Sequence, residues 1–163
     1  MISCRWRTGG WSLSEEKGKS YTAYAEPTFD DMDFCAKLRL TKTSDQSAAY
    51  VGLVFWMKDA NNFYTFQITP DGSAAVYQMV DNKWQDVIKD RASASIHQGA
   101  VRFNELEVVT RGHLATLIIN GDRFDDVAGE EPDGGQHVGF SVQAPDAGDA
   151  TFAIDDLLVT AGK

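Results

Sequence analysis

The chain has 163 residues, of which 43% are hydrophobic and 11% aromatic, a composition typical of one folded domain and not of a disordered chain. Its 24 acidic residues outnumber its 15 basic residues, so the formal net charge at pH 7 is −9. We therefore expect no nucleic-acid partner and no acidic membrane surface, because both repel an acidic protein. No apolar run in the sequence approaches the roughly 20 residues of a membrane-spanning helix, so membrane insertion is not expected either.

The first residues do not read as a secretion signal. Met1 to Cys4 has neither the charged region nor the apolar region of a signal peptide. Because Trp6 and Trp11 follow at once, we expect a domain taken from a longer chain that is periplasmic or secreted. Cys4 and Cys35 are the two cysteines, and the sequence is compatible both with a disulfide between neighbouring strands and with two free buried thiols.

Short runs of strand-forming residues fill the first half of the chain. From Phe34 to Leu40 the even-numbered residues are apolar, a period of two that predicts a strand with one buried face. The run from Tyr50 to Met57 is apolar on both faces, as in a central strand that is covered on each side. We expect strands at 5–13, 20–26, 34–40, 50–57, 63–69, 73–80 and 84–89, and an irregular connection at 90–102.

The stretch from Gly99 to Gly121 carries the clearest pattern. An alternating run ends at a turn around Gly112, a second apolar run follows, and Asn120-Gly121 is the strongest short signal for a hairpin with a type I′ turn. We expect three consecutive antiparallel strands over 103–128, a loop at 129–135, and strands at 137–144 and 151–160 that flank a loop at 145–149. The fold predicted for 1–163 is a single all-β domain, an antiparallel two-sheet sandwich of eleven or twelve strands.

The spacing of seven residues in this stretch resembles the concanavalin A-like lectin/glucanase superfamily, and within it laminin-G-like and 3-keto-disaccharide-hydrolase-type bacterial domains. These residues are Gly99, Asn104, Leu106, Val108, Gly112, Asn120 and Gly121, and the segments 50–55, 59–68 and 152–159 agree with the resemblance in order. The resemblance implies a jelly roll whose curved sheet binds glycans in many members. In related sugar-binding domains an Asp of the last strand often helps to hold a structural calcium ion, which implies Asp155 or Asp156 as a ligand.

Aromatic and amide residues on one sheet are the candidate sugar-binding residues. Sugar sites use flat aromatic rings against C–H patches and amides or carboxylates for the hydroxyl groups. If Phe55 faces the core, the neighbouring Trp56 faces the other surface of the sheet, together with polar residues of the next strand. We therefore expect a carbohydrate site formed by Trp56, Gln67, Tyr77 and Trp84.

Two other classes of function remain open. Glu105 and Glu107 share a strand face and would be the catalytic carboxylates of a glycoside hydrolase of the 3-keto-disaccharide type, although the acidic triplet typical of glucanases is absent from the sequence. The other alternative is an adhesion or assembly domain that docks a protein through a sheet face. Zinc spacing, P-loop and nucleophile motifs are also absent from the sequence. The leading prediction is a non-catalytic, lectin-like module that binds a carbohydrate or a glycan-bearing surface.

Overall fold

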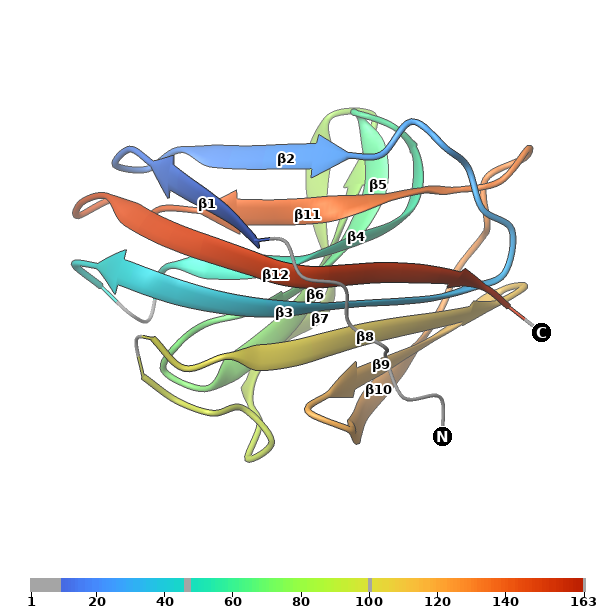
Figure 1. Ribbon diagram of the computed structural model, residues 1–163. Coiled ribbons are helices and arrows are strands. Elements are labelled where there is room, and N and C mark those ends of the chain that lie inside the picture. The colour runs from blue at the N-terminus through green and yellow to red at the C-terminus, as the bar shows by residue number, and fades with distance from the viewer. Residues whose placement is uncertain (1–9, 46–47, 100, 163) are drawn as a thin grey trace.

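The computed structural model describes residues 10–45, 48–99 and 101–162, which form two stacked antiparallel sheets (Figure 1). This part of the chain contains no helix long and apolar enough to cross a membrane. The twelve strands of the described residues are β1 (Gly10–Glu15), β2 (Ser20–Tyr24), β3 (Met32–Thr43), β4 (Tyr50–Asp59), β5 (Asn62–Ile68), β6 (Ser73–Val80), β7 (Lys83–Ala92), β8 (Asn104–Arg111), β9 (Leu114–Ile119), β10 (Asp122–Ala128), β11 (His137–Gln143) and β12 (Ala150–Ala161).

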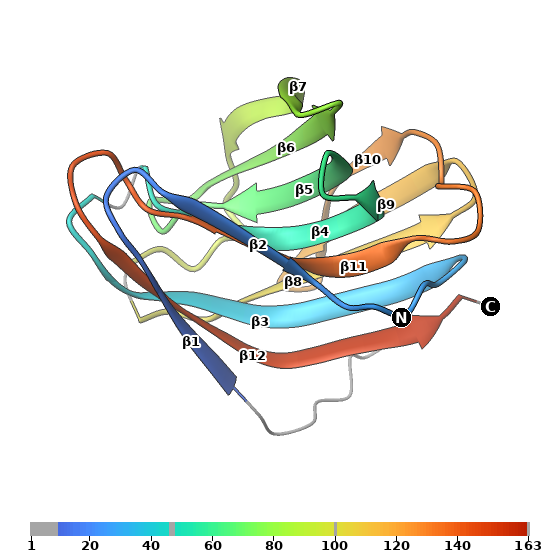
Figure 2. The same ribbon diagram turned by 90° about the horizontal axis from the view of Figure 1, so that it is seen from above.

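Each sheet has six strands. The first has the order β1-β12-β3-β8-β9-β10 and the second the order β2-β11-β4-β5-β6-β7. Figure 2 shows the sheets as separate layers, with β3 and β12 in one layer and β4 and β11 in the other. The late strands β11 and β12 insert between early strands, β11 between β2 and β4 and β12 between β1 and β3, so each lies next to an edge strand of its sheet. The predicted two-sheet antiparallel sandwich is confirmed.

The core lies between the sheets and follows the alternation read from the sequence. Phe34 and Leu38 of β3 and Leu106 of β8 are fully buried from the first sheet, and Leu53 and Phe66 are buried from the second. Because side chains of a strand alternate between its faces, these positions place one apolar row of each sheet in the shared interior.

The β9–β10 hairpin turns as predicted, since Asn120 and Gly121 both have positive φ, at 51° and 88°. The Asn120 side chain also donates to Asn104 Oδ1 at 2.8 Å and to the Ser95 carbonyl at 2.7 Å. These bonds hold part of the connection between β7 and β8. That connection is shorter than predicted, because β7 continues to Ala92.

Strand β4 carries a bulge that changes which residues face the core. Its pairing with β5 shifts register between Phe55 and Asp59, and Trp56 has a φ of 44°. As a result the adjacent residues Phe55 and Trp56 both belong to the core cluster, although neighbouring residues of a regular strand point to opposite faces. Elsewhere, Cys35 is buried and is not a free cysteine, whereas Cys4 lies outside the described residues.

Candidate functional site

Three aromatic rings lie next to one another on the outer side of the second sheet. They are Phe63 of β5, Tyr77 of β6 and Trp84 of β7, and we call them the aromatic face. The Trp84 ring meets Phe63 edge to face, with centroids 5.6 Å apart, and Tyr77 in the same manner at 6.4 Å. Trp84 is 52% exposed, while Phe63 is buried and Tyr77 is half-buried. Two packed rings therefore support one ring that is open to solvent.

An apolar cluster adjoins this face and includes Phe63. Val54, Met57, Phe63 and Met79 form a second cluster of buried residues, separate from the core between the sheets. Met79 pairs with both Phe63 and Trp84 in the sheet register. The cluster fixes the position of Phe63, and through the ring contact it restricts Trp84.

Polar groups border the aromatic face. The Tyr77 hydroxyl donates to Asp90 Oδ2 at 2.5 Å, and burial, followed by this hydrogen bond and the Asp90 charge, raises the pKa of Tyr77. Gln67 lies on the same side of β5 as Phe63, four residues along the strand, and pairs with Ala75 of β6. The site thus combines a ring surface with amide, hydroxyl and carboxylate groups.

A pocket opens beside the aromatic face, at the end of the sandwich where β4, β5 and β6 meet the loop before β11. This end pocket has a volume of about 440 Å³ and shares Phe63 and Met79 with the surface described above. Pockets of this size fall within the range that holds small-molecule ligands. Its lining includes the aromatic residues Trp56, Phe63 and Tyr64, the amides Asn62 and Gln78, the carboxylates Glu130, Glu131 and Asp133, and Lys58.

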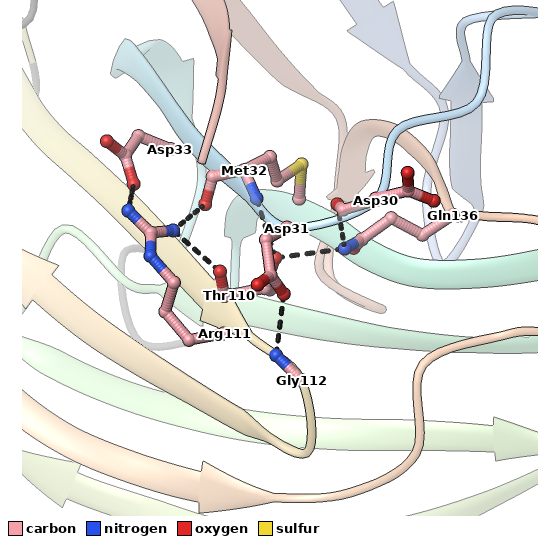
Figure 3. A network of polar contacts seen from close by, with 8 residues as sticks. All are labelled: Asp30, Asp31, Met32, Asp33, Thr110, Arg111, Gly112 and Gln136. Atoms are coloured by element: carbon pink, nitrogen blue, oxygen red, sulfur yellow. Dashed lines mark hydrogen bonds and ion pairs between the residues drawn. The ribbon is translucent and has the colours of Figure 1, made fainter. Parts of the chain in front are cut away.

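Gln136 holds the pocket loop against the bulge of β4. Its Oε1 accepts the backbone N–H of Trp56 at 2.8 Å. Its Nε2 donates to Thr110 Oγ1 at 3.0 Å and to the Asp30 carbonyl at 3.2 Å (Figure 3). Gln136 is fully buried, and Thr110 Oγ1 also accepts the Met32 N–H. The side chain therefore satisfies a donor that the bulge removes from the sheet ladder, and it joins the two sheets at this end.

Carboxylates secure the neighbouring turns. Asp31 Oδ1 accepts the backbone N–H of Gly112 at 2.6 Å, and Arg111 Nη2 donates to Asp33 Oδ1 at 2.8 Å (Figure 3). Sequence reasoning did not find this network, because Gln136 and the Asp residues are in segments that resemble ordinary polar loops. No local signal distinguishes a glutamine that bridges segments far apart in the sequence.

The prediction that Trp56 faces the surface is wrong. Trp56 is 2% exposed and packs its ring against Phe55 and Tyr64, at centroid distances of 5.4 and 5.3 Å. The bulge in β4 is the reason, because it adds a residue and reverses the direction of the side chain. Gln67, Tyr77 and Trp84 do share the outer side of the second sheet, and their role in binding stays a prediction.

The two candidate catalytic residues lie on the other sheet. Glu105 and Glu107 of β8 pair with Lys37 and Cys35 of β3, and neither is among the residues that line the end pocket. Glu107 is 8% exposed, and burial, then the charges of Asp33 and Glu105, raise its pKa. Burial also raises the pKa of Glu105, while nearby Lys37 opposes that shift.

Asp155 and Asp156, the predicted calcium ligands, lie at a bulge of β12. Register shifts between Asp155 and Leu158, and Asp156 has a φ of 54°. Asp156 Oδ2 faces Lys37 Nζ at 3.6 Å. Within the described residues no group of three His, Cys, Asp or Glu side chains gathers as a metal site does. Calcium takes six to eight oxygen ligands, so these two side chains would need other ligands beside them.

Comparison with known proteins identifies the fold. No family model and no curated protein matches the sequence. Among solved structures, the carbohydrate-binding module CBM66 from Bacillus subtilis is similar with a TM-score of 0.73 and 12% identity, over 96% of this chain and 95% of that one. The Emp46p carbohydrate recognition domain has a TM-score of 0.68 and 10% identity, over 94% of this chain and 88% of that one.

An enzyme is also similar. Alginate lyase A1-II′, of polysaccharide lyase family 7, has a TM-score of 0.65 and 12% identity, over 93% of this chain and 79% of that one. These structures share the concanavalin A-like jelly roll, and this chain has the same fold. The predicted jelly-roll fold is thereby confirmed. Fold alone does not define function, which depends on the site.

Proposed function

We propose that this chain is a non-catalytic, lectin-like module that binds a carbohydrate across the aromatic face. The observation that carries the proposal is Trp84, a half-exposed indole supported edge-on by Phe63 and Tyr77. A large exposed aromatic side chain on a rigid base provides contact area at little entropic cost, because its rotation is already restricted. The C–H face of a sugar ring matches such a surface.

Polar groups next to the rings are suited to the hydroxyl groups of a sugar. Gln67 offers both an amide donor and an amide acceptor, and Asp90 is a carboxylate acceptor that already receives the Tyr77 hydroxyl. Specific sugar recognition needs this combination, since apolar contact supplies affinity and polar groups supply orientation. The names of two similar structures, a carbohydrate-binding module and a carbohydrate recognition domain, support the same class of ligand.

The hydrolase alternative finds less support in the geometry. A glycosidase places two carboxylates on either side of a cleft. Glu105 and Glu107 are two residues apart on one strand of the first sheet, and the end pocket and aromatic face belong to the second. We accordingly favour glycan binding over glycan hydrolysis. We propose that this binding takes place outside the cytoplasm.

A glycan array tests the proposal with three proteins: the unmodified chain, Trp84→Ala and Tyr21→Ala. Tyr21 is the matched control, because it is 46% exposed but lies on β2, the opposite edge strand of the same sheet. We expect Trp84→Ala to weaken binding to any recognised glycan at least tenfold, as loss of an aromatic anchor costs about 2 kcal/mol or more. Tyr21→Ala should bind normally.

Two results would contradict the proposal. One is an array on which the unmodified chain recognises no carbohydrate. The other is an unchanged signal for Trp84→Ala, which would show that the glycan binds elsewhere. Circular dichroism of each variant confirms that the fold is retained.

A further inference from the structure

We infer that the end pocket selects an amino sugar, a glycan unit that carries a protonated amine. This inference rests on the proposed function, and it names the chemical class of the unit that occupies the pocket beside the aromatic face. It goes beyond the aromatic face itself, which would accept neutral sugars equally well. Four observations about the pocket support it.

The first observation is the charge of the lining. Among the described residues that line the pocket, Glu130, Glu131 and Asp133 carry carboxylates and Lys58 carries the one ammonium group. The three carboxylates come from positions 130, 131 and 133 of one loop, and that loop is anchored by Gln136. A carboxylate and an ammonium group form a hydrogen bond roughly twice as strong as a neutral one. A uronic acid would meet like charges in the same place.

The second observation is the aromatic wall. The rings of Trp56 and Tyr64 meet at 79°, with centroids 5.3 Å apart. Gly129 lies directly against both, because a Cβ added there would be 2.5 Å from the Trp56 ring and 3.0 Å from the Tyr64 hydroxyl. Glu130 and Tyr64 line the same pocket, and burial, followed by the Glu130 charge, raises the pKa of Tyr64. Aromatic faces next to carboxylates attract cations through both effects.

The third observation is a buried acceptor. Glu131 lines both the end pocket and a neighbouring pocket that contains Asp30 and Asp31. Gln136 bonds its carboxylate, but the Oε1 atom is buried and has no hydrogen-bond partner of its own among the described residues. A charged N–H donor that bonds such a buried carboxylate oxygen lowers the free energy of the complex, because the hydrogen bond offsets the cost of desolvating the oxygen. Burial, then the charges of Asp31 and Asp30, raise the pKa of Glu131, and a bound cation would oppose this shift.

The fourth observation is continuity with the proposed binding face. Phe63 lines the pocket and also contacts Trp84, and Met79 lines the pocket beneath the same rings. A glycan that stacks on Trp84 can therefore place a neighbouring unit in the pocket. The end pocket selects the sugar unit that enters it. The aromatic face adds affinity that is the same whichever unit occupies the pocket.

The test compares three monosaccharides that differ at a single position: glucose, glucosamine and N-acetylglucosamine. Each is titrated into the ¹⁵N-labelled chain at pH 6 and low ionic strength, and amide shifts are followed at Tyr64 and Gly129. We expect glucosamine to shift both resonances and to bind roughly tenfold tighter than the two uncharged sugars. High salt should reduce this ratio, since the attraction is partly screened.

Charge-neutral variants locate the effect. Glu131→Gln and Glu130→Gln should each lower the preference for glucosamine severalfold, and two variants protect the test against failure of one to fold. Glu16→Gln is the matched control, because Glu16 is an exposed carboxylate at the β1–β2 turn, at the opposite end of the sandwich (Figure 1). It should leave the preference unchanged.

Equal shifts for glucose and glucosamine would overturn the inference, as would a preference that survives both glutamine variants. If Nα-acetyl-lysine amide moves the same resonances more strongly than glucosamine, the amine is recognised without the sugar and the assignment to an amino sugar is wrong. The proposed function is judged separately. Binding of neutral glycans that depends on Trp84 would uphold it even when no amine preference is found.

Discussion

Trp56 and Trp84 belong to the same sheet and are both predicted to bind sugar, yet the structure places them in opposite environments. Trp56 is 2% exposed, and its backbone N–H is bonded to the buried Gln136. Trp84 is 52% exposed and lies on β7, an edge strand. The difference arises from one bulge in β4, which turns Trp56 inward, whereas no such bulge affects Trp84 at the start of β7. The comparison teaches that the role of an aromatic residue follows from strand register.

The largest expected effect is that of Trp56→Ala on stability. Removing a buried indole leaves a cavity beside Phe55 and Tyr64, and such truncations cost about 3–5 kcal/mol. Urea denaturation followed by circular dichroism measures the change. A variant that keeps its stability within about 1 kcal/mol would break the comparison, because Trp56 would then not be a core residue.

Gln136→Leu tests what holds the bulge in place. Leucine has a similar volume but cannot accept the Trp56 N–H, which would be left buried without a partner at a cost of about 1–3 kcal/mol. Gln143→Leu is the control, since Gln143 is an exposed glutamine at the end of β11, the strand that follows Gln136. The two midpoints of urea unfolding are compared. Equal midpoints would show that the bulge forms without the glutamine.

Trp84→Ala should have the reverse profile of Trp56→Ala. Half of the ring is already in water, so its removal should lower the free energy of unfolding by about 1 kcal/mol or less while glycan binding is lost. The measurement is the same urea denaturation. A loss comparable with that of Trp56→Ala would mean that the ring serves the fold, and its proposed place in the binding site would need to be withdrawn.

Glu107→Gln tests whether burial of a carboxylate on the first sheet makes the stability of the protein depend on pH. The folded state raises the pKa of Glu107 above its ordinary 4.5, chiefly by burial, so it binds the proton more tightly than the unfolded state does. Stability from this group is present below pH 4.5 and is lost as the pH rises through the folded pKa. At pH 7 the variant should therefore have a melting temperature about 1–2 °C above that of the unmodified chain. At pH 4 the two proteins should melt at the same temperature. A lower melting temperature at pH 7 would contradict this.

The smallest expected effect concerns calcium. If Asp155 and Asp156 hold an ion, a chelator lowers the melting temperature, because binding to the folded state adds to its stability. The Asp156–Lys37 ion pair already occupies one of these carboxylates, so we expect EGTA to change the melting temperature by less than about 1 °C. Asp155→Asn is measured beside it. A drop of several degrees that this variant abolishes would instead establish the metal site.

The sequence by itself determined the strands and how they stack. Alternation such as that of Phe34 to Leu40 and turns such as Asn120-Gly121 are local signals, because side chains alternate along any regular strand and a type I′ turn needs two residues with positive φ. For the same reason Gln67 could be assigned to the outer side of its strand. These predictions require no knowledge of residues far away in the chain.

Only the tertiary structure decided the direction of Trp56 and the shape of the end pocket. The bulge of β4 is completed by Gln136, which lies 80 residues further along the chain, and the pocket loop is held by the same side chain. A contact between such distant residues leaves no local pattern in the sequence. The period of two therefore holds for regular strands and fails at the bulge, where a hydrogen bond from another part of the chain replaces the ladder.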